Sequence, residues 1–450
     1  MAVQDKVLVD KKRLILGLGQ TGLSVARFLQ SQSQAFRVMD TRTEPPGLAE
    51  LEALAPNSYL LWNESKFSEF DELVVSPGIS VQTAEFQQAR EQGVKIIGDI
   101  ELFAQMNNKP VIAITGSNGK STVTDLLAQL INASGKTAEI GGNFGVPALD
   151  LLQSDADFIV LELSSFQLET TYKLQPLAAT ILNISEDHLD RYQSYQDYID
   201  AKQRIYRRAK TAVINHNDEQ TWSLMDQQLE FGLVPSEDGD DELVTWQVNT
   251  QSKTIERSGE KVLALNELRL QGTHNGLNLA AAFALLEAAD IEINQPVLEA
   301  AKRYSGLEHR CQFVTVKNGV TYINDSKATN VGATLAAIES FSPLFDAMIL
   351  IAGGDAKDAN LEPLAPALNQ SVSQLVAFGK DGKTLTLLAP EKSHLVANLA
   401  QALVKAQQLI KQQSLENCLV LLSPACASLD MFNNYQERGD KFMKLVRALA

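Results

Sequence analysis

Apolar and polar positions along the chain form short apolar runs that alternate with segments of helical periodicity. In the first hundred residues, apolar runs at 13–16, 36–39 and 73–75 are separated by a glycine turn and by a helical segment that begins at Leu23. Short strands that alternate with helices are typical of a parallel sheet covered by helices on its faces. We therefore predict an α/β arrangement for this part of the chain.

The middle of the chain repeats this pattern and then departs from it. Apolar runs at 111–114, 158–163 and 178–182 predict buried strands, and apolar residues between Val123 and Ile131 recur at helical spacing up to Gly135. Residues 232–270 are acidic at first and then alternate, which predicts an antiparallel flap on the parallel sheet. A helix is expected at 277–289.

The last third of the chain returns to alternating strands and helices. Strands are predicted at 320–323, 347–351, 374–378 and 418–422. Polar or small-residue loops follow the first, second and fourth of these. Ligands of open α/β sheets bind beyond the carboxyl ends of the strands, so these loops are candidate binding elements.

We predict an α/β protein of three domains. These are a Rossmann-like N-terminal domain at 1–98, a central P-loop-type mononucleotide-binding domain at 99–306, and a Rossmann-like C-terminal domain at 307–450. The length of 450 residues agrees with about three domains of ordinary size.

Composition narrows the class of protein. The apolar content of 45% is that of a core-forming chain, and no apolar run approaches the length of a membrane span, so we expect no membrane insertion. A net charge of −16 argues against nucleic acid as a partner. The N-terminus does not resemble a signal peptide, and Cys311, Cys418 and Cys426 have no metal-ligand spacing, so we expect a cytoplasmic protein.

The most informative segment is the loop after the strand at 111–114. It runs Thr-Gly-Ser-Asn-Gly-Lys-Ser-Thr at 115–122 and delivers Lys120, Ser121 and Thr122 to the start of a helix. Backbone N–H groups and a helix N-terminus suit phosphates, a lysine adds charge, and a hydroxyl can ligate Mg²⁺. Only two residues separate Gly116 from Gly119, so the loop is shorter than the common P-loop.

The turn Gly-Leu-Gly-Gln-Thr-Gly at 17–22 follows a strand and opens a helix, and Asp40 ends the next strand. This spacing fits an NAD-binding Rossmann domain. It fits equally a cradle for another diphosphate, such as a nucleotide sugar, or a tight turn that packs a helix on a sheet. The pattern alone leaves these readings open.

Two side chains near the phosphate loop are candidates for metal binding or catalysis. Glu162 ends the buried run at 158–163, where a carboxylate needs a partner and can hold Mg²⁺ or cap the next turn. His188 follows the next strand and is either functional or structural.

Lys202 lies on the same helix face as Tyr195, Tyr198, Ile199 and Tyr206. Its stem could cover apolar surface while the ammonium stays in water. Alternatively, the amine is desolvated and reacts with CO₂ to form a carbamate, which would turn a cation into a metal ligand.

The polar loops of the third domain carry Asp325, Lys327 and Thr329 on one strand end and Asp355 with Lys357 on another. Cations and hydroxyls together could hold a small dicarboxylate. Helix capping by Asp325 and Ser326 is the structural alternative.

Taken in order, these motifs resemble the Mur ligases of peptidoglycan synthesis, and within them the branch that adds D-glutamate. The resemblance spans essentially the whole chain. The motifs that carry it are Gly-Leu-Gly-Gln-Thr-Gly at 17–22, Ser-Pro-Gly at 76–78, the phosphate loop at 115–122, Gly-Gly-Asn at 141–143, Glu-Leu-Ser-Ser-Phe-Gln-Leu-Glu at 162–169, Asp-His at 187–188, Lys202, Thr-His-Asn-Gly-Leu-Asn at 273–278, His-Arg at 309–310, Asn-Asp-Ser-Lys-Ala-Thr-Asn at 324–330, and Ser-Pro-Ala-Cys-Ala-Ser-Leu-Asp at 423–430.

The resemblance implies a reaction in which ATP phosphorylates the carboxylate of UDP-N-acetylmuramoyl-L-alanine and the amine of D-glutamate attacks the acyl phosphate. It implies the cofactors ATP and Mg²⁺, a monomer, and a role in cell-wall synthesis and hence cell shape and division. It argues against NAD as the ligand of the first turn.

The same resemblance assigns site residues. Those for the UDP-substrate are Gln20, Thr21, Asp40, Thr41, Arg42, Ser76, Gly78 and Asn143. Those for ATP are Gly116, Ser117, Asn118, Gly119, Lys120, Ser121, Thr122, Asn278, Arg310 and Asp325. Those for D-glutamate are Lys327, Thr329, Lys357 and Ser428. Ser121, Glu162, His188 and carbamylated Lys202 would bind metal, and Lys120 would join the last three in catalysis.

Three positions depart from the family pattern. Ala356 stands where a glycine is frequent, Tyr435 where a phenylalanine is common, and Gln20 where an apolar residue is usual. None removes a charge that the mechanism needs. The alternatives that remain are a sister ligase or folylpolyglutamate-like synthase with another amino-acid substrate, and a non-ligase NAD-binding protein.

Overall fold

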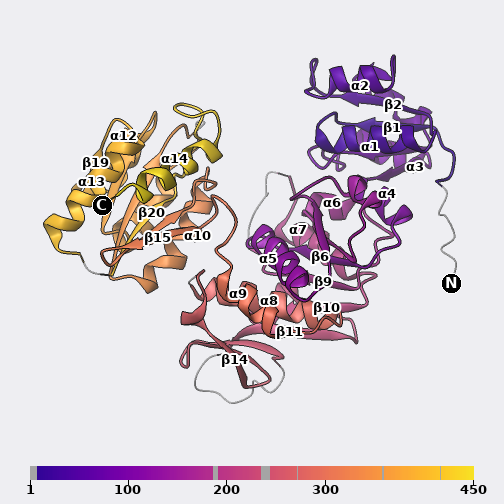
Figure 1. Ribbon diagram of the computed structural model, residues 1–450. Helices are drawn as coiled ribbons and strands as arrows, with labels where there is room; N and C mark the ends of the chain where they lie inside the picture. The colour runs from indigo at the N-terminus through magenta and orange to yellow at the C-terminus, as the bar shows by residue number, and fades with distance from the viewer. Residues whose placement is uncertain are drawn as a thin grey trace. The chain divides into compact units, whose positions relative to one another are not determined.

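The structure is a computed structural model that describes residues 8–185, 191–234, 244–270, 272–356, 359–415 and 417–449 (Figure 1). The chain divides into two compact units. The first runs to residue 263 and includes 277–301, and the second comprises 264–276 and the chain from 302 onward. Among the described helices, none has the length and apolar character needed to cross a membrane.

The first sheet is parallel, with strand order β3-β2-β1-β4-β5. Its strands are β1 Arg13–Leu16, β2 Phe36–Asp40, β3 Tyr59–Leu61, β4 Glu72–Val75 and β5 Lys95–Ile97, and the helices are α1 Gln20–Ser31, α2 Leu48–Leu54 and α3 Ala84–Glu91. The predicted parallel sheet is confirmed. Because the strand order reverses direction at β1, a crevice opens beyond the carboxyl ends of β1 and β4.

The second sheet has nine strands in the order β14-β13-β12-β11-β10-β9-β6-β8-β7. The strands are β6 Val111–Thr115, β7 Ala138–Gly142, β8 Phe158–Glu162, β9 Ala178–Ile181, β10 Thr211–Asn215, β11 Gln228–Val234, β12 Trp246–Asn249, β13 Thr254–Arg257 and β14 Glu260–Ala264. The helices that accompany it are α4 Asp99–Met106, α5 Lys120–Ala133, α6 Ser165–Glu169, α7 Tyr195–Gln203, α8 Thr273–Ala288 and α9 Gln295–Arg303. Strand β6 lies between β8 and β9, so the phosphate loop leaves the sheet from an interior strand.

The antiparallel flap predicted for residues 232–270 is only partly correct. Strand β11 pairs in parallel with both β10 and β12, and the antiparallel pairing begins between β12 and β13. The segment therefore extends the main sheet before it reverses. Alternation of apolar residues reports a half-buried strand but not the direction of its partner, which explains the error.

The first two sheets share one apolar core. Ile15 and Val38 of the first sheet belong to the same buried cluster as Ile100 of α4 and Ile159 of β8. The opposite face of the first sheet packs separately, through Leu14 and its neighbours, against Phe67 and Phe86. The continuous core explains why residues on both sides of position 98 form a single compact unit.

The third sheet, of the second unit, has the order β15-β16-β20-β17-β18-β19, and only its β15–β16 pair is antiparallel. The strands are β15 Gln312–Lys317, β16 Val320–Asn324, β17 Ala347–Gly353, β18 Gln374–Phe378, β19 Ser393–Leu395 and β20 Cys418–Leu422. The helices are α10 Val331–Phe341, α11 Ala365–Ser371, α12 Gly382–Leu388, α13 Leu399–Gln413 and α14 Tyr435–Arg447. The 3-10 helices of the chain are η1 Glu64–Glu69, η2 Ala148–Gln153, η3 Arg204–Tyr206, η4 Glu219–Thr221, η5 Leu265–Glu267, η6 Ser342–Leu344, η7 Glu362–Leu364 and η8 Pro390–Lys392.

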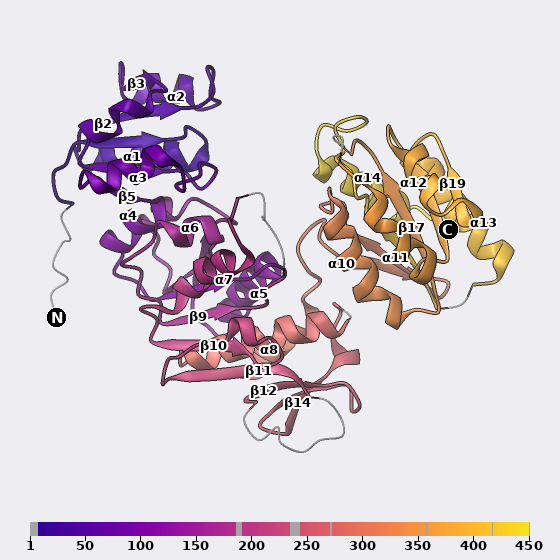
Figure 2. The ribbon, with the colours of Figure 1, turned by 180° about the vertical axis from the view of Figure 1, so that it is seen from behind.

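Helices cover both faces of the third sheet (Figures 1 and 2). Leu350 of β17 points to the face covered by α10, α11 and α12, whereas its neighbours Ile349 and Ile351 point to the face covered by α13 and α14. Successive side chains of a strand alternate between faces, so a strand buried on both sides is apolar throughout. The carboxyl ends of β16, β17 and β20 are left for the polar loops.

Candidate active site

A cavity of about 490 Å³ lies beyond the carboxyl ends of β1, β2 and β4 in the first unit. All eight residues predicted to hold the UDP-substrate line it. Its lining is Gly17, Gly19, Gln20, Thr21, Asp40, Thr41, Arg42, Ser76, Pro77, Gly78, Ile79, Gly142, Asn143, Gly145, Pro147 and Gln167. The cavity therefore joins the glycine turn of the first sheet to the ends of β7 and α6 beside the second.

The glycine turn brings the start of α1 against the end of β1. A Cβ atom at Gly22 would lie 1.9 Å from the carbonyl oxygen of Gly17, so only glycine permits this approach. Gln20 and Thr21 stand in the first turn of α1, where backbone N–H groups point out of the helix and favour an anion. The turn can hold a diphosphate at the rim of the cavity.

Both carboxylate oxygens of Asp40 accept hydrogen bonds from the protein. Its Oδ1 accepts from the backbone N–H and Nε of Arg42, and its Oδ2 accepts from the N–H of Leu18 at 2.6 Å and from Nη2 of Arg42. The Arg42 side chain is the main reason that the pKa of Asp40 is lowered to about 2. Four donors fill the four acceptor positions of a carboxylate, so Asp40 orients Arg42 and does not present an acceptor to an NAD ribose.

The phosphate loop is held by the end of β9. The N–H of Ser117 donates to the carbonyl of Asn183 at 2.9 Å, and the N–H of Asn118 donates to the Asn183 side chain at 2.8 Å. Gly119 caps α5 with φ of +80°, a conformation that favours glycine. Since two loop N–H groups are used in this way, phosphate binding falls to the helix start at Gly119 and beyond.

Two lysines converge on the carbonyl oxygen of Gly116. Lys120 donates to it at 2.7 Å and to the carbonyl of Ser117 at 2.9 Å, while Lys202 donates to it at 2.8 Å. Lys202 is only 2% exposed and lies 4.8 Å from the centre of the Tyr198 ring. Its ammonium is thus inside the protein beside the phosphate loop, and the snorkelling reading of this lysine is wrong.

Glu162 is a buried carboxylate with one oxygen left over. Its Oε1 accepts from the side-chain amide of Asn143 at 2.7 Å, and its Oε2 is buried with no hydrogen-bond partner among the residues that the structure describes. A buried anionic oxygen without a partner is costly unless a cation approaches it. Ser121, 5% exposed, follows Lys120 at the start of α5 and offers a hydroxyl of the kind that ligates Mg²⁺.

The structure describes three of the four residues predicted to bind metal. In the described part of the chain, no group of three or more His, Cys, Asp or Glu side chains is placed to hold a metal ion. The predicted set contains a serine and a modified lysine besides Glu162, and His188 lies outside the described residues. Glu162, with its unpartnered oxygen, is the member whose surroundings fit a cation.

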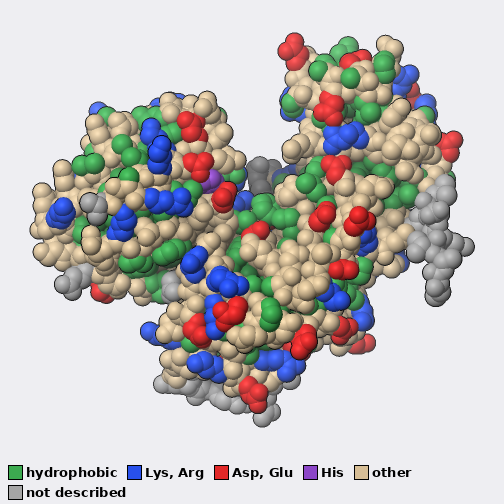
Figure 3. All heavy atoms as spheres, viewed as in Figure 1, with side chains coloured by type: hydrophobic (Ala, Val, Ile, Leu, Met, Phe, Trp, Pro, Cys, Tyr) green, Lys and Arg blue, Asp and Glu red, His purple; other side chains and the backbone are tan. Residues whose placement is uncertain are grey.

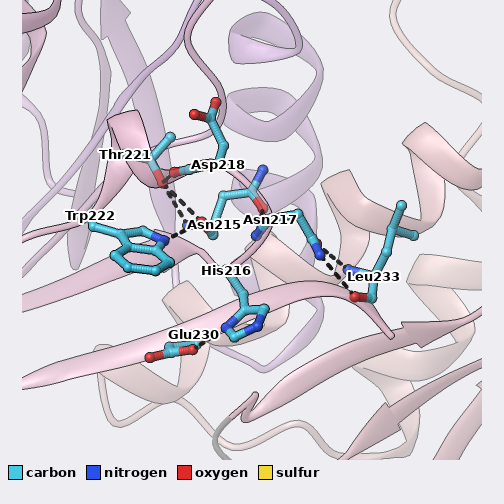
Figure 4. A network of polar contacts seen from close by, with 8 residues as sticks. All are labelled: Asn215, His216, Asn217, Asp218, Thr221, Trp222, Glu230 and Leu233. Carbon is cyan, nitrogen blue, oxygen red and sulfur yellow. Dashed lines mark hydrogen bonds and ion pairs between the residues drawn. The ribbon is translucent and has the colours of Figure 1, made fainter. Parts of the chain in front are cut away.

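A network of polar side chains beyond β10 supports the end of β9 (Figure 4). Thr221 donates to the carbonyl of Asn215 at 3.1 Å. The Asn215 amide donates to the carbonyl of Leu182 at 2.9 Å. Asp218 accepts from the N–H of Ile184 at 2.7 Å. The strand end that holds the phosphate loop is therefore itself fixed from behind.

Asn278 is the predicted ATP residue of α8. A Cβ atom at Gly119 would lie 2.9 Å from its Oδ1, so this side chain is beside the phosphate loop. Arg310 and Asp325, the other predicted ATP residues beyond the loop, belong to the second unit.

In the second unit, each carboxylate oxygen of Asp325 accepts a hydrogen bond. Its Oδ1 accepts from the N–H of Cys311 at 3.1 Å and its Oδ2 from the hydroxyl of Ser423 at 2.8 Å. Burial raises the pKa of Asp325 to about 7. Its structural role is clear from these bonds, while its role at the ATP ribose stays a prediction.

The predicted D-glutamate residues lie on loops of the same sheet. The ammonium of Lys327 lies 4.2 Å from the centre of the Tyr435 ring, and burial lowers the pKa of Lys327. Thr329 donates its N–H to the carbonyl of Lys327, and Ser428 is 3% exposed. Lys357 lies outside the described residues. Tyr435, one of the departures from the family pattern, thus presents its ring to a candidate ligand lysine.

Arg438 of α14 organises these loops and was not predicted. It is completely buried and donates to the hydroxyl and carbonyl of Ser326, to the carbonyl of Gly353 and to the carbonyl of Cys426. One side chain therefore ties together the loops after β16, β17 and β20. A lone arginine in an amphipathic helix carries no sequence signal of such a role.

Two further residues were also missed. Gln167 lines the cavity, and its Oε1 accepts from Ser164 in the capping box of α6. Asn183 holds the phosphate loop from the end of β9. Gln167 lies in the 162–169 motif, and Asn183 is the polar residue that directly follows the predicted strand at 178–182, which was the available signal.

The charge of the chain is spread over its surface. On the face shown in Figure 3, acidic and basic side chains are interspersed over both units. A dense basic field of the kind that binds nucleic acid is not what this face presents.

Models of three protein domains match consecutive parts of the chain. A Mur ligase MurD-like N-terminal domain matches residues 11–98, a Mur ligase middle domain matches 114–286, and a Mur ligase glutamate ligase domain matches 309–426.

Curated relatives match over nearly the full length. A UDP-N-acetylmuramoylalanine--D-glutamate ligase of Pseudoalteromonas translucida (strain TAC 125) is 46% identical over 447 residues, which cover 98% of each chain. A ligase of the same name from Marinobacter nauticus (strain ATCC 700491 / DSM 11845 / VT8) is 45% identical, with 98% of this chain and 99% of that protein covered.

Solved structures of related folds also match. The UDP-N-acetylmuramate-alanine ligase of Thermotoga maritima has a TM-score of 0.56 at 21% identity and covers 97% of this chain and 99% of its own. A folylpolyglutamate synthase of Mycobacterium tuberculosis has a TM-score of 0.54 at 15% identity, over 74% of this chain and 91% of its own. Likeness at this level of identity shows the fold alone.

Proposed function

Because the chain belongs to the Mur ligase family, we propose that it is the ATP-dependent ligase that joins D-glutamate to UDP-N-acetylmuramoyl-L-alanine in peptidoglycan precursor synthesis. Relatives named for D-glutamate ligation match this chain at 41–46% identity over nearly its whole length. The family resemblance and the α/β fold predicted from the motifs are confirmed by these matches.

One structural observation supports the proposal most strongly. The cavity is lined by the glycine turn of the first sheet and also by Asn143, whose amide is bonded to Glu162. A substrate with a diphosphate at one end and a carboxylate at the other would bind its diphosphate near Gln20 and direct its carboxylate toward Glu162. The distance between anchor and reacting group is thereby set by the protein.

The first chemical step is phosphoryl transfer. A carboxylate oxygen of the substrate attacks the γ-phosphorus of ATP, the bond to the β–γ bridging oxygen breaks, and ADP leaves. Two anions must meet, so the step needs positive charge at the phosphates. Lys120 and the N-terminus of α5 supply charge and N–H donors from this chain, and Mg²⁺ held by Ser121 and Glu162 would supply more.

The second step forms the amide. The neutral amine of D-glutamate attacks the acyl carbon, the tetrahedral intermediate loses phosphate, and the amine proton leaves with a base. Lys327, Thr329, Lys357 and Ser428 would hold the carboxylates of D-glutamate. The lowered pKa of Lys327 reflects burial, and a bound carboxylate would compensate for the desolvation of its ammonium.

Further parts of the proposal rest on the family pattern. His188 and a carbamate on Lys202 would complete the metal set, and the burial of Lys202 beside the phosphate loop supports a role there. Domain limits near residues 98 and 306, a monomeric state and a cytoplasmic location also belong to the proposal.

The test is an assay of ADP release with ATP, Mg²⁺ and UDP-N-acetylmuramoyl-L-alanine, to which D-glutamate, L-alanine or meso-diaminopimelate is added in turn. We expect release with D-glutamate alone. Lys120→Ala should lower turnover on the order of 10³-fold, because the charge at the transferred phosphate is lost. Lys136→Ala, an exposed lysine beyond the end of the same helix, is the matched control.

Release with another amino acid would assign a sister activity. Nicotinamide binding, together with indifference to Lys120→Ala, would instead indicate the NAD-binding alternative.

A further inference from the structure

Arg191 reaches from the second sheet to the turn after β4 of the first. Its Nη1 donates to the carbonyl of Pro77 at 2.6 Å, and its Nη2 donates to the carbonyl of Ile79 at 2.9 Å. Pro77, Gly78 and Ile79 all line the cavity. Two parallel donors on one rigid plane fix both the position and the orientation of this turn.

The guanidinium is held in place by an aromatic ring. Its central carbon lies 3.8 Å from the centre of the Phe166 ring of α6, and Phe166 stacks on Tyr192 at 5.9 Å between ring centres. Stacking on an aromatic face restricts the plane of the guanidinium, so the two donors stay directed at their carbonyls.

Aromatic contacts extend from Tyr192 to the phosphate loop. Tyr192 contacts Tyr198 at 5.4 Å between ring centres, and the Tyr198 hydroxyl lies 3.0 Å from the hydroxyl of Ser117. Arg191 therefore lies at one end of a continuous series of contacts whose other end is the loop at Ser117. None of these aromatic residues was singled out for this role in the sequence.

We propose that Arg191 is a positioning residue that holds the 76–79 turn in register with the phosphate loop, and so sets where the carboxylate of the UDP-substrate meets ATP. This inference rests on the proposed function, because it needs the cavity to hold the UDP-substrate. Reacting atoms must approach to about 3–3.5 Å, and a misplacement of about 1 Å costs about 100-fold in rate. Arg191 acts through the turn and makes no contact with the reacting groups.

The test compares Arg191→Met with Arg204→Met. Arg204 also donates to two carbonyls, those of Leu168 and Thr171, and also lies over an aromatic ring, but both of its acceptors belong to α6 and the turn after it. The two variants lose the same kind of interaction, and only Arg191 reaches the first sheet.

We expect Arg191→Met to lower kcat/KM for the UDP-substrate by about 100-fold while KM for ATP changes less than about twofold. Arg204→Met should keep kcat/KM for the UDP-substrate within about threefold of the unmodified protein. Arg191→Lys keeps the charge but has no fork, so it should recover less than a tenth of the loss. Guanidinium ion added at millimolar concentration should restore part of the activity of Arg191→Ala.

Thermal unfolding of each variant identifies any that fails to fold. If Arg191→Met does not fold, Arg191→Lys is compared with Arg204→Met in its place. Equal effects of Arg191→Met and Arg204→Met, or a parallel rise of KM for ATP, would overturn the inference. Full activity of Arg191→Lys would overturn it as well. If the unmodified protein forms no product from UDP-N-acetylmuramoyl-L-alanine and D-glutamate, the proposed function itself has failed.

Discussion

Buried charged side chains lie at the carboxyl ends of strands in both the second and the third sheet, but their hydrogen bonding differs. In the second sheet, Glu162 has one oxygen bonded to Asn143, and its other oxygen has no partner within the described part of the chain. In the third sheet, both oxygens of Asp325 are bonded, and the guanidinium of Arg438 donates to three different loops. The two sheets belong to similar α/β folds, but the hydrogen bonding of their buried side chains differs.

This difference separates two uses of the same place in a fold. A buried charged group whose partners are all inside the protein stabilises loops. A buried oxygen without a partner carries a desolvation penalty, which a bound cation would offset. We therefore assign Glu162 to ligand binding and Arg438 to the architecture that presents ligand residues. Variants at these two residues should therefore differ in whether they lose activity or stability.

The largest effect is expected on stability, from Arg438→Met. The change keeps the apolar stem but leaves three loop carbonyls without their donor, so the free energy of unfolding should fall by about 3–5 kcal/mol. Chemical denaturation followed by fluorescence measures this change. Arg447→Met, an exposed arginine on the same helix, should change stability by less than about 0.5 kcal/mol. Equal stability of the two variants would contradict the assignment.

Glu162→Gln should lower turnover and leave stability unchanged, the opposite of what is expected for Arg438→Met. The amide keeps the shape of the side chain and removes the charge that we propose to hold Mg²⁺, so turnover should fall by about 100- to 1000-fold and the Mg²⁺ requirement should rise. The melting temperature should not fall, because the buried oxygen had no partner to lose. Glu139→Gln on the neighbouring strand, where the side chain is exposed, serves as control. A large loss of stability with normal turnover would reverse the roles of the two sheets.

Lys202→Ala should lower turnover by about 10- to 100-fold, as expected for a group that supports the ligands of the proposed metal site. If a carbamate forms on the amine, bicarbonate should raise the activity of the unmodified protein, and a small carboxylate such as formate should partly rescue the alanine variant. Rates measured with and without these additions test the point. Full unaided activity of Lys202→Ala would exclude a role for this residue.

A pH dependence of stability is expected from Asp325. Burial raises the pKa of Asp325 to about 7 in the folded chain, above the ordinary value of 3.8. The folded state therefore holds a proton that the unfolded state releases, and this contribution to stability is present below about pH 4 and is lost as the pH rises to about 7. Relative to Asp325→Asn, the unmodified protein should lose stability over this interval. Parallel curves of denaturation midpoint against pH would contradict it.

What could be predicted from the sequence follows from the range of the interactions. The glycine turn at 17–22 and the phosphate loop at 115–122 are built from neighbours in the chain, so their glycines and hydroxyls mark them directly. All residues predicted for the UDP-substrate line one cavity, since parallel strands end at the same edge of a sheet.

Other features depend on partners far away in the chain. Arg438 bonds to Ser326 and Gly353, and Arg191 bonds to Pro77, across separations of 85 to 114 residues. Periodicity reports which face of a helix is buried but not which atoms face it there. Lys202 illustrates the limit, because its helix face was predicted and the Gly116 carbonyl that its ammonium reaches was not.

Isotopic labelling of oxygen shows whether the substrate carboxylate is activated as an acyl phosphate. UDP-N-acetylmuramoyl-L-alanine labelled with ¹⁸O in its carboxylate is incubated with ATP, Mg²⁺, D-glutamate and the protein, and the released phosphate is analysed by mass spectrometry. Activation as an acyl phosphate predicts one ¹⁸O atom in each phosphate and one in the new amide. Unlabelled phosphate, or label found in AMP, would contradict the account.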